Sequence, residues 1–303
     1  MPSWGLGFAR IVGRVLTMCA LVLVLVAIVF ALDAHQSQSA ARGSSLQTAV
    51  DLRPQIKQRG LVVRDQGDRL TCTVFAITFL IEYQAAGSTA EPKGLDLSEE
   101  YLNWAGNESN GRPYQDGGKF ARFINAFETW GIATAQQMPY RSSFDPGSPP
   151  MPTSAVIASA KSMFPSRYPF AELKRWDNST GLSDSQLRAV LDELRSGEPV
   201  AIGVWWPYRY TTDDVDGVPL ATDYPRTQAS LFMESPLFDG HSIDLVGFRE
   251  DASFPGGGYF IFRNSFGPSF GDHGYGFVSF RYVRTYSTDA VAIGTMPRSI
   301  AAR

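Results

Sequence analysis

The first half of the chain carries apolar residues at helical spacing. Residues 72–84, CTVFAITFLIEYQ, are apolar on almost every side, which is typical of a helix buried in the middle of a protein. Residues 97–105, LSEEYLNWA, place Ser98 before two acids, as at a helix N-terminus, although Tyr101 occupies the position where a capping box has glutamate. Both segments are predicted to be helices.

Two more segments have the pattern of amphipathic helices. Residues 117–131 place apolar side chains at helical spacing and end at Gly131, a residue favoured just after a helix. Residues 183–197 begin at Ser183, a favoured N-cap, and end at Gly197. The pattern therefore predicts one helix in each segment.

Strand patterns dominate after Pro199. Residues 200–206, VAIGVWW, indicate a buried strand. Residues 241–248, 259–265 and 274–280 indicate three more strands, with turn residues between them. Because helices come first and antiparallel strands second, the order favours an α+β protein with two lobes over a doubly wound sheet.

The N-terminal region contains a long apolar run. No charge occurs from Val15 to Leu32, a length of 18 residues, and Arg10 and Arg14 precede the run. A membrane-spanning helix needs about 20 apolar residues, whereas the apolar region of a cleaved signal peptide has roughly 7–15. We expect an uncleaved transmembrane anchor at 15–32, with a secretory signal peptide as the alternative.

The anchor implies a division of the chain and a location. Residues 1–14 are expected to be cytoplasmic, residues 33–48 to form a polar linker, and residues 49–303 to form the folded domain. The flanking arginines place that domain on the extracytoplasmic side of a single-pass membrane protein. If cleavage occurs instead, near residues 39–41, the domain is secreted.

Composition excludes several classes of protein. Hydrophobic residues make up 44% of the chain and charged residues 19%, which are values of a globular protein. The net charge is −3, and the mixed charges form no basic stripe, so nucleic acid is not an expected partner. The two cysteines are Cys19, in the apolar run, and Cys72, which excludes a disulfide framework and paired-thiolate zinc sites in the folded domain. We expect no cofactor or metal, and the oligomeric state stays open.

Cys72 lies where a thiol can become reactive. It follows a polar loop and begins the predicted buried helix, and a helix N-terminus lowers the pKa of a thiol, as does a nearby imidazolium. Of the three histidines, His35 lies in the linker and His273 in a turn, so His241, at the start of a strand, is the best candidate base. Asn264 ends the next strand and can orient the imidazole. Taken singly, each residue is equally compatible with an ordinary structural role.

Six segments, in this order, carry a family resemblance: DLRPQIKQRGLVVRDQGDRLTCTVFA (51–76), LSEEYL (97–102), QDGGKFARFI (115–124), WGIATAQQMPY (130–140), GHSIDLVGF (240–248) and YFIFRNSFGPSFGDHGYGFVSF (259–280). Together they resemble papain-like cysteine peptidases along most of the folded domain, in a bacterial, membrane-anchored form. The resemblance implies a two-lobed fold, with a helical lobe around the cysteine-bearing helix and an antiparallel β lobe.

The resemblance also implies the catalytic roles. Cys72 would be the nucleophile, His241 the general base and acid, and Asn264 the residue that orients His241. The family places a glutamine six residues before its cysteine, and Gln66 has this spacing. The Gln66 side chain and the Cys72 backbone N–H would form the oxyanion hole.

Substrate binding is implied by the same motifs. Gly117 and Gly118 match the glycine pair along which a substrate backbone approaches, although they can also simply precede a helix. Ser242, beside the histidine, is assigned to substrate binding as well. The expected partner is a peptide or protein, hydrolysed through an acyl-enzyme intermediate.

The chain departs from the family pattern in the packing around these groups. Arg69 replaces a disulfide cysteine, Leu70 replaces a glycine and Thr73 replaces the tryptophan that follows the nucleophile. Phe266 and Phe270 stand in place of tryptophans that cover the asparagine. Two alternatives therefore stay open: a weak or inactive pseudoenzyme that binds peptides, and a transpeptidase or amidase that uses the same thiolate.

The family's long inhibitory prosegment is expected to be missing. Only residues 33–50 separate the apolar run from Asp51, where the resemblance begins. Inhibition by such a prosegment would then not operate in this chain.

Overall fold

The computed structural model describes residues 47–87, 93–111, 114–143, 145, 147–163, 168–207, 214–215, 218–219 and 238–294. The predicted cytoplasmic segment, the predicted anchor at 15–32 and nearly all of the predicted linker lie outside these residues. No helix within the described ranges has both the length and the apolar character needed to span a membrane.

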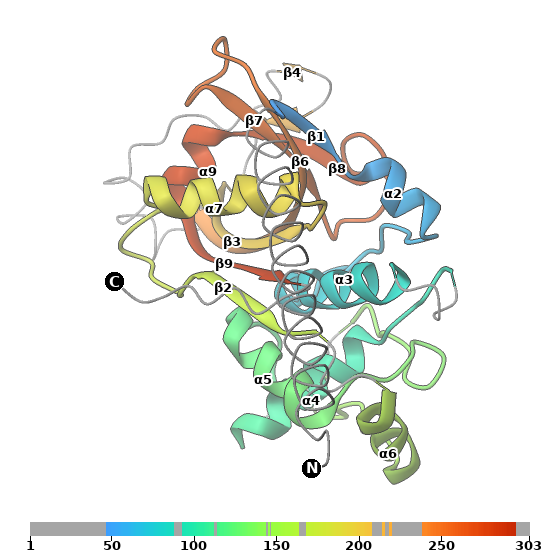
Figure 1. Ribbon diagram of the computed structural model, residues 1–303. Helices are drawn as coiled ribbons and strands as arrows, with labels where there is room; N and C mark the ends of the chain where they lie inside the picture. Colours follow the sequence, from blue (N-terminus) through green and yellow to red (C-terminus); the bar gives the residue numbers. More distant parts are fainter. Residues whose placement is uncertain are drawn as a thin grey trace, which may run out of the picture. The chain divides into compact units, whose positions relative to one another are not determined.

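The main sheet lies on one side of α3 (Cys72–Ala86), together with α7 (Asp184–Arg195) and α9 (Phe280–Tyr286), which pack against its strands; α4 (Glu99–Asn110), α5 (Phe120–Trp130) and α6 (Ser154–Met163) lie on the other side (Figure 1). The helices are α2 (Arg53–Gln58), α3 (Cys72–Ala86), α4 (Glu99–Asn110), α5 (Phe120–Trp130), α6 (Ser154–Met163), α7 (Asp184–Arg195) and α9 (Phe280–Tyr286). The strands are β1 (Ala49–Asp51), β2 (Phe170–Lys174), β3 (Val200–Pro207), β4 (Asp214–Val215), β5 (Val218–Pro219), β6 (Phe238–Glu250), β7 (Gly258–Arg263), β8 (Tyr275–Ser279) and β9 (Ser287–Ile293).

The main sheet has the strand order β2-β9-β3-β6-β7-β8, and β1 also pairs with β6. Every one of these pairs is antiparallel. In the register of the central strands, Val204 of β3 lies opposite His241 of β6, and Asp244 of β6 lies opposite Arg263 of β7. The predicted α+β class with an antiparallel sheet is therefore confirmed.

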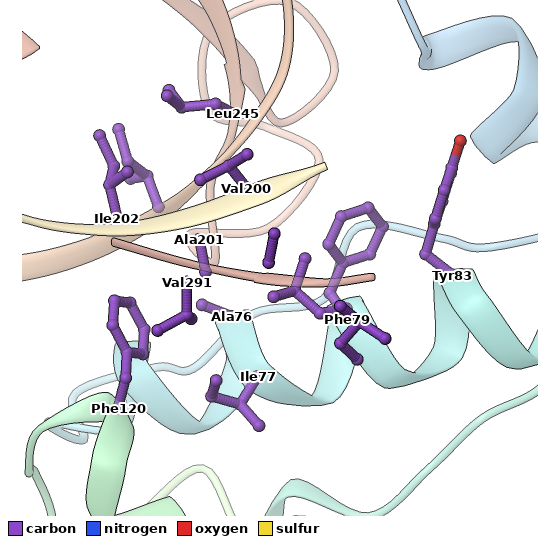
Figure 2. Close-up of a cluster of buried hydrophobic side chains, with 14 of the residues drawn as sticks. Ala76, Ile77, Phe79, Tyr83, Phe120, Val200, Ala201, Ile202, Leu245 and Val291 are labelled. Atoms are coloured by element: carbon purple, nitrogen blue, oxygen red, sulfur yellow. The ribbon is translucent and has the colours of Figure 1, made fainter. Parts of the chain in front are cut away.

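Helix α3 is buried on almost every side because it has packing partners all around it. It contacts β3, β6 and β9 of the sheet and also α4 and α5. Figure 2 shows Ala76 of α3 next to the strand residues Ala201 and Val291, in line with the contacts of α3 with β3 and β9. A helix without a polar face is stable in water only in such a position, which accounts for the apolar run that predicted it.

Local capping signals place two of the helix ends. The Ser98 hydroxyl accepts a hydrogen bond from the Tyr101 N–H at 2.9 Å and so caps α4. At α7 the capping box is complete, since Ser183 and Gln186 each bind the other's backbone N–H. Each such cap satisfies donors that the first helical turn leaves unpaired.

The predicted helix at 117–131 begins later than expected, at Phe120. Gly117 and Gly118 have φ angles of 84° and 155°, which are incompatible with helical backbone. The glycine pair therefore belongs to the segment before α5. At the other end the prediction is confirmed, because Gly131 is the C-cap of α5.

The three predicted strands around the candidate site correspond to β6, β7 and β8, with ends shifted by up to three residues. Asn264 lies just beyond the end of β7 rather than inside it. Other elements carried too little pattern to be predicted, notably the short α2, α6 and α9 and the strands β2 and β9. Strand β9 is buried along its whole length, so its sequence shows no alternation of apolar and polar residues.

Two glycines at helix ends provide a test of this packing. Both Gly131 and Gly197 have positive φ, at 69° and 85°, but a Cβ on Gly131 would lie 2.1 Å from the Ala160 carbonyl oxygen, whereas nothing lies within 4 Å at Gly197. We expect Gly197→Ala to cost about 1 kcal/mol of unfolding free energy, from backbone strain alone, and Gly131→Ala at least about 2 kcal/mol more. Urea denaturation of both variants measures the difference, and equal costs would contradict the packing of α5 against α6.

Candidate active site

A cleft of about 560 Å³ lies between the helices and the sheet. The loop 66–72 and the segment 117–119 line one side of it, and residues of β3 and β6 line the other. The cleft contains all but one of the residues that the sequence assigned to the site: Gln66, Cys72, Gly117, Gly118, His241 and Ser242. The remaining one, Asn264, lies behind His241 and is buried.

Cys72 is the first residue of α3, with Thr71 as the N-cap. The Thr71 hydroxyl does not cap the helix, because it is bound to the Tyr140 hydroxyl at 2.7 Å. The N–H groups of a first helical turn have no partner within the helix. The Cys72 N–H therefore remains available to a ligand in the cleft, and the Cys72 side chain begins at the positive end of the helix dipole.

The pKa of the Cys72 thiol lies below its ordinary value. Burial raises this pKa, but the hydrogen bond and the charge of His241 lower it. Contacts with the Ser242 backbone and the Thr73 side chain lower it further. The contacts outweigh the burial, so the environment favours the thiolate, which is the nucleophilic form of cysteine.

Asn264 holds one ring nitrogen of His241, the Nε2 atom. This Nε2 lies 2.8 Å from Asn264 Oδ1, and this oxygen also accepts the Ser265 N–H at 2.8 Å. The Ser265 bond identifies the amide atom as an oxygen, which can only accept, so the proton of the neutral imidazole lies on Nε2. Nδ1 is then the nitrogen left to exchange a proton with Cys72.

Aromatic rings enclose the imidazole of His241. Phe266 stacks on it with a centroid distance of 4.7 Å and an interplanar angle of 23°. Trp206 meets it edge-on at 5.1 Å, and Phe270 supports Phe266 at 5.7 Å. The phenylalanines that replace tryptophans thus still cover the His241–Asn264 hydrogen bond. His273, in contrast, has a side chain that is 91% exposed and lies in a turn.

The Gln66 side chain is fixed at both of its polar atoms. Its Nε2 donates to the Arg69 carbonyl oxygen at 2.6 Å, and its Oε1 accepts the Ser265 hydroxyl at 2.6 Å. The Gln66 backbone N–H also donates to the Ser265 carbonyl oxygen at 2.8 Å. Since an amide nitrogen carries two hydrogens, one remains for a ligand after the bond to Arg69. Ser265 links this amide to Asn264, its neighbour in the chain.

Thr73 is a residue whose contribution the sequence did not reveal. Its hydroxyl donates to the Gly118 carbonyl oxygen at 2.9 Å and lies 3.0 Å from the Ser242 hydroxyl. It therefore joins α3, the glycine segment and β6 at the position where papain-like peptidases have a tryptophan. The replacement changes an aromatic contact into a hydrogen-bonded one next to Cys72.

Leu70, the other departure in the loop, causes no backbone strain. Among the described residues, His273 is the one non-glycine residue with positive φ, so a side chain at position 70 is tolerated. Leu70 is 64% exposed and lines the cleft close to Gly117. A substrate side chain bound near Gly117 would meet this apolar group.

The far end of the cleft contains residues without a sequence signal. Lys119, Trp176, Thr288 and Asp289 all line it. The Lys119 ammonium lies 3.2 Å from the centre of the Trp176 ring. Burial raises the pKa of Asp289, although hydrogen bonds from Thr288 and the Phe120 backbone lower it. Thr288 and Asp289 belong to β9 and Trp176 to the loop after β2, two strands that the pattern did not predict.

No group of three or more His, Cys, Asp or Glu side chains suited to a metal ion occurs in the part of the chain that the structure describes. The arrangement instead provides a thiol with lowered pKa, a histidine able to exchange its proton and donors beside them. These groups suit nucleophilic attack on a carbonyl carbon, followed by proton transfer.

Comparison with solved structures finds the same fold in several proteins. Xylellain, a cysteine protease from Xylella fastidiosa, superposes with a TM-score of 0.63 at 20% identity, over 83% of this chain and 87% of that one. Digestive procathepsin L 3 of Tenebrio molitor gives a TM-score of 0.51 at 21% identity, over 82% and 70% of the two chains. Bromelain from Ananas comosus gives 0.51 at 19% identity, over 82% and 99%.

A search of curated protein sequences finds no match. The sequence profile of the papain family cysteine proteases, however, matches residues 46–293. This range is most of the chain and includes every residue of the cleft. The predicted family is thereby confirmed: this chain belongs to the papain family of cysteine proteases.

Proposed function

We propose that this cysteine peptidase hydrolyses peptide bonds through Cys72, His241 and Asn264. The observation that carries the proposal is the continuous contact from Asn264 through His241 to a thiol whose pKa is lowered. The three groups line or directly support one cleft, and the oxyanion donors expected beside them lie at Gln66 and at the Cys72 N–H.

The first half of the reaction forms an acyl-enzyme. The Cys72 thiolate attacks the carbonyl carbon of the scissile bond, and the electron pair of the C=O moves onto oxygen. The Gln66 Nε2–H and the Cys72 N–H stabilise this oxyanion, each contributing about 10²–10³ in rate. When the C–N bond breaks, protonated His241 gives its proton to the leaving amine, and a thioester remains on Cys72.

The second half releases the acid. His241, now neutral, takes a proton from a water molecule that attacks the thioester carbonyl. The C–S bond breaks, the carboxylic acid leaves, and the thiolate–imidazolium pair is restored. Asn264 keeps the imidazole in the same orientation throughout because its Oδ1 holds the Nε2 proton.

The substrate backbone would lie along Gly117 and Gly118, with Ser242 on the opposite side. Gly118 leaves little room for a side chain, since its Cβ would lie 3.0 Å from Phe123 and Arg122 atoms. Transfer of the acyl group to an amine instead of water would make the chain a transpeptidase. Water oxygen in the new carboxyl group of the product identifies hydrolysis, and a new amide bond identifies transfer.

A digest of a peptide library tests the activity. Purified full-length protein is expected to cleave peptides, with water oxygen in the new carboxyl group, and Cys72→Ser to lose at least about 10³ in kcat/KM. His241→Ala should lose a similar factor, whereas His273→Ala, the exposed histidine, should behave as the unchanged chain. Binding without turnover by a folded wild-type protein would make it a pseudoenzyme.

The pH dependence of alkylation tests the lowered thiol pKa. A lowered pKa keeps the thiolate populated below the ~8.5 of a free thiol, so iodoacetamide should still react fast at pH 6. His241→Ala should move the midpoint of the rate profile to higher pH, because the charge and the hydrogen bond that lower the pKa are lost. Asn264→Ala should move it less. A midpoint near that of free cysteine, indifferent to His241, would contradict the proposed pair.

We further propose that residues 15–32 anchor the chain in a membrane, with the peptidase domain on the extracytoplasmic side. The support is the charge-free run preceded by Arg10 and Arg14. A reporter fused after Arg303 should be active on the extracytoplasmic side and sediment with membranes. A reporter signal from the cytoplasm refutes the orientation, and a soluble, shortened secreted chain supports a cleaved signal instead.

A further inference from the structure

Arg69 is a buried cation in the middle of the nucleophile loop. Its side chain is 1% exposed, and its guanidinium binds both carboxylate oxygens of Asp116, at 2.7 and 2.9 Å. A third bond joins it to Glu100 at 2.5 Å. Burial lowers the pKa of Arg69, but the bonds to Asp116 and Glu100 raise it by more. The pKa therefore lies above its ordinary value, and the group stays charged.

The two ends of Arg69 reach two different parts of the proposed catalytic machinery. Its backbone carbonyl accepts the hydrogen bond from Gln66 Nε2 that orients the oxyanion donor. Its side chain holds Asp116, the residue directly before Gly117. One residue thus links the oxyanion donor to the glycine segment that would carry the substrate backbone.

Tyr140 strengthens the same link from the other side. Its ring lies 4.8 Å from the Arg69 guanidinium carbon. Its hydroxyl donates to the Gln66 carbonyl oxygen at 2.8 Å and is bound to the Thr71 hydroxyl at 2.7 Å. The loop is therefore held at its beginning, its middle and its end.

The partners of Arg69 are themselves fixed. Glu100 accepts bonds from the Tyr114 hydroxyl at 2.6 Å and the Arg141 N–H at 2.9 Å, and Asp116 accepts one from Asn103 at 2.9 Å. A planar guanidinium that binds a carboxylate through two parallel bonds sets direction as well as distance, which a lysine ammonium cannot do. With no second cysteine between residues 47 and 294, no disulfide can serve the same purpose there.

We propose that Arg69 is a positioning residue of this site: it sets the spacing between the loop that bears Gln66 and Cys72 and the Gly117–Gly118 segment opposite. The inference rests on the proposed function and concerns how the oxyanion donor is held. Arg69 acts through Gln66 and Asp116 and does not touch the reacting atoms.

The main test combines Arg69→Lys with Gln66→Ala. Arg69→Lys keeps the charge but loses the two parallel bonds, and we expect kcat/KM for peptides to fall about 10–100-fold, mostly in kcat, as for a misplaced oxyanion donor. In the Gln66→Ala background, the same change should cost less than about 3-fold, because the donor it positions is already absent. The affinity of tripeptide aldehydes, which form a tetrahedral adduct with the thiol, should fall in parallel with kcat/KM.

Alkylation of Cys72 by iodoacetamide separates a positioning effect from a general structural defect, because a structural defect would slow both alkylation and catalysis. We expect its rate at pH 6 to stay within about 2-fold in Arg69→Lys, since the pairing with His241 is untouched. Arg195→Lys is the matched control, because Arg195 binds Asp192 and Glu250 through a largely buried guanidinium but lies outside the cleft. If Arg69→Lys does not fold, Asp116→Asn carries the same test.

Three results for the variants would overturn the proposal. They are a kcat/KM within 3-fold of wild type in folded Arg69→Lys, a loss in the double variant equal to the sum of the two single losses in free energy, or alkylation slowed as much as catalysis. Failure of wild type to bind any aldehyde would also overturn it, because no oxyanion site would then exist to be positioned. A wild type that binds aldehydes but cleaves no peptide refutes the hydrolase alone. In that case the aldehyde affinities of the variants still decide the role of Arg69.

Discussion

The site depends on the burial of α3 between the sheet and the other helices. A helix of this length has little stability by itself in water, so tertiary contacts on all its faces hold it in place. Its first residue is Cys72, and the sheet strand with which it makes the most extensive contact, β6, carries His241. The same packing that stabilises the domain therefore brings the thiol and the imidazole together from distant parts of the chain.

Buried charges surround the loop that precedes α3. Arg69 binds Glu100 and Asp116, and Arg64 binds Glu82 at 2.6 Å and Glu99 at 2.9 Å. Burial raises the pKa of Glu99 to about 7, even though the charge of Arg64 lowers it. Such buried pairs contribute little net stability, but the loss of one partner leaves an uncompensated charge, so they penalise any other arrangement of the loop.

The environment of His241 combines polar and aromatic contacts. Asn264 holds one ring nitrogen, while Phe266 and Trp206 cover the ring and keep water from competing for that hydrogen bond. A hydrogen bond shielded from water is stronger and more directional than an exposed one. Substitution of tryptophan by phenylalanine preserves this shielding, and Thr73 replaces another aromatic contact by hydrogen bonds to Gly118 and Ser242.

The sequence by itself determined the features that depend on local residue patterns and on the order of the motifs. The apolar run after Cys72 predicted a buried helix, the caps at Ser98 and Ser183 predicted helix starts, and the ordered segments around Gln66 and His241 predicted the family. Asn264 was assigned because it stands at the end of a recognisable strand pattern. These signals come from residues that are close together in the chain, so they can be recognised without knowing what packs against them.

Tertiary structure alone decided which residues form ion pairs, which form hydrogen bonds and which line the same cleft. The sequence showed Arg69 only as a missing cysteine, because its partners Glu100 and Asp116 are far away along the chain. Asp289 was missed for a similar reason: β9 is buried on both faces and has no alternation to mark it as a strand. Long-range contacts depend on how elements pack, and a single sequence has no pattern that records this packing.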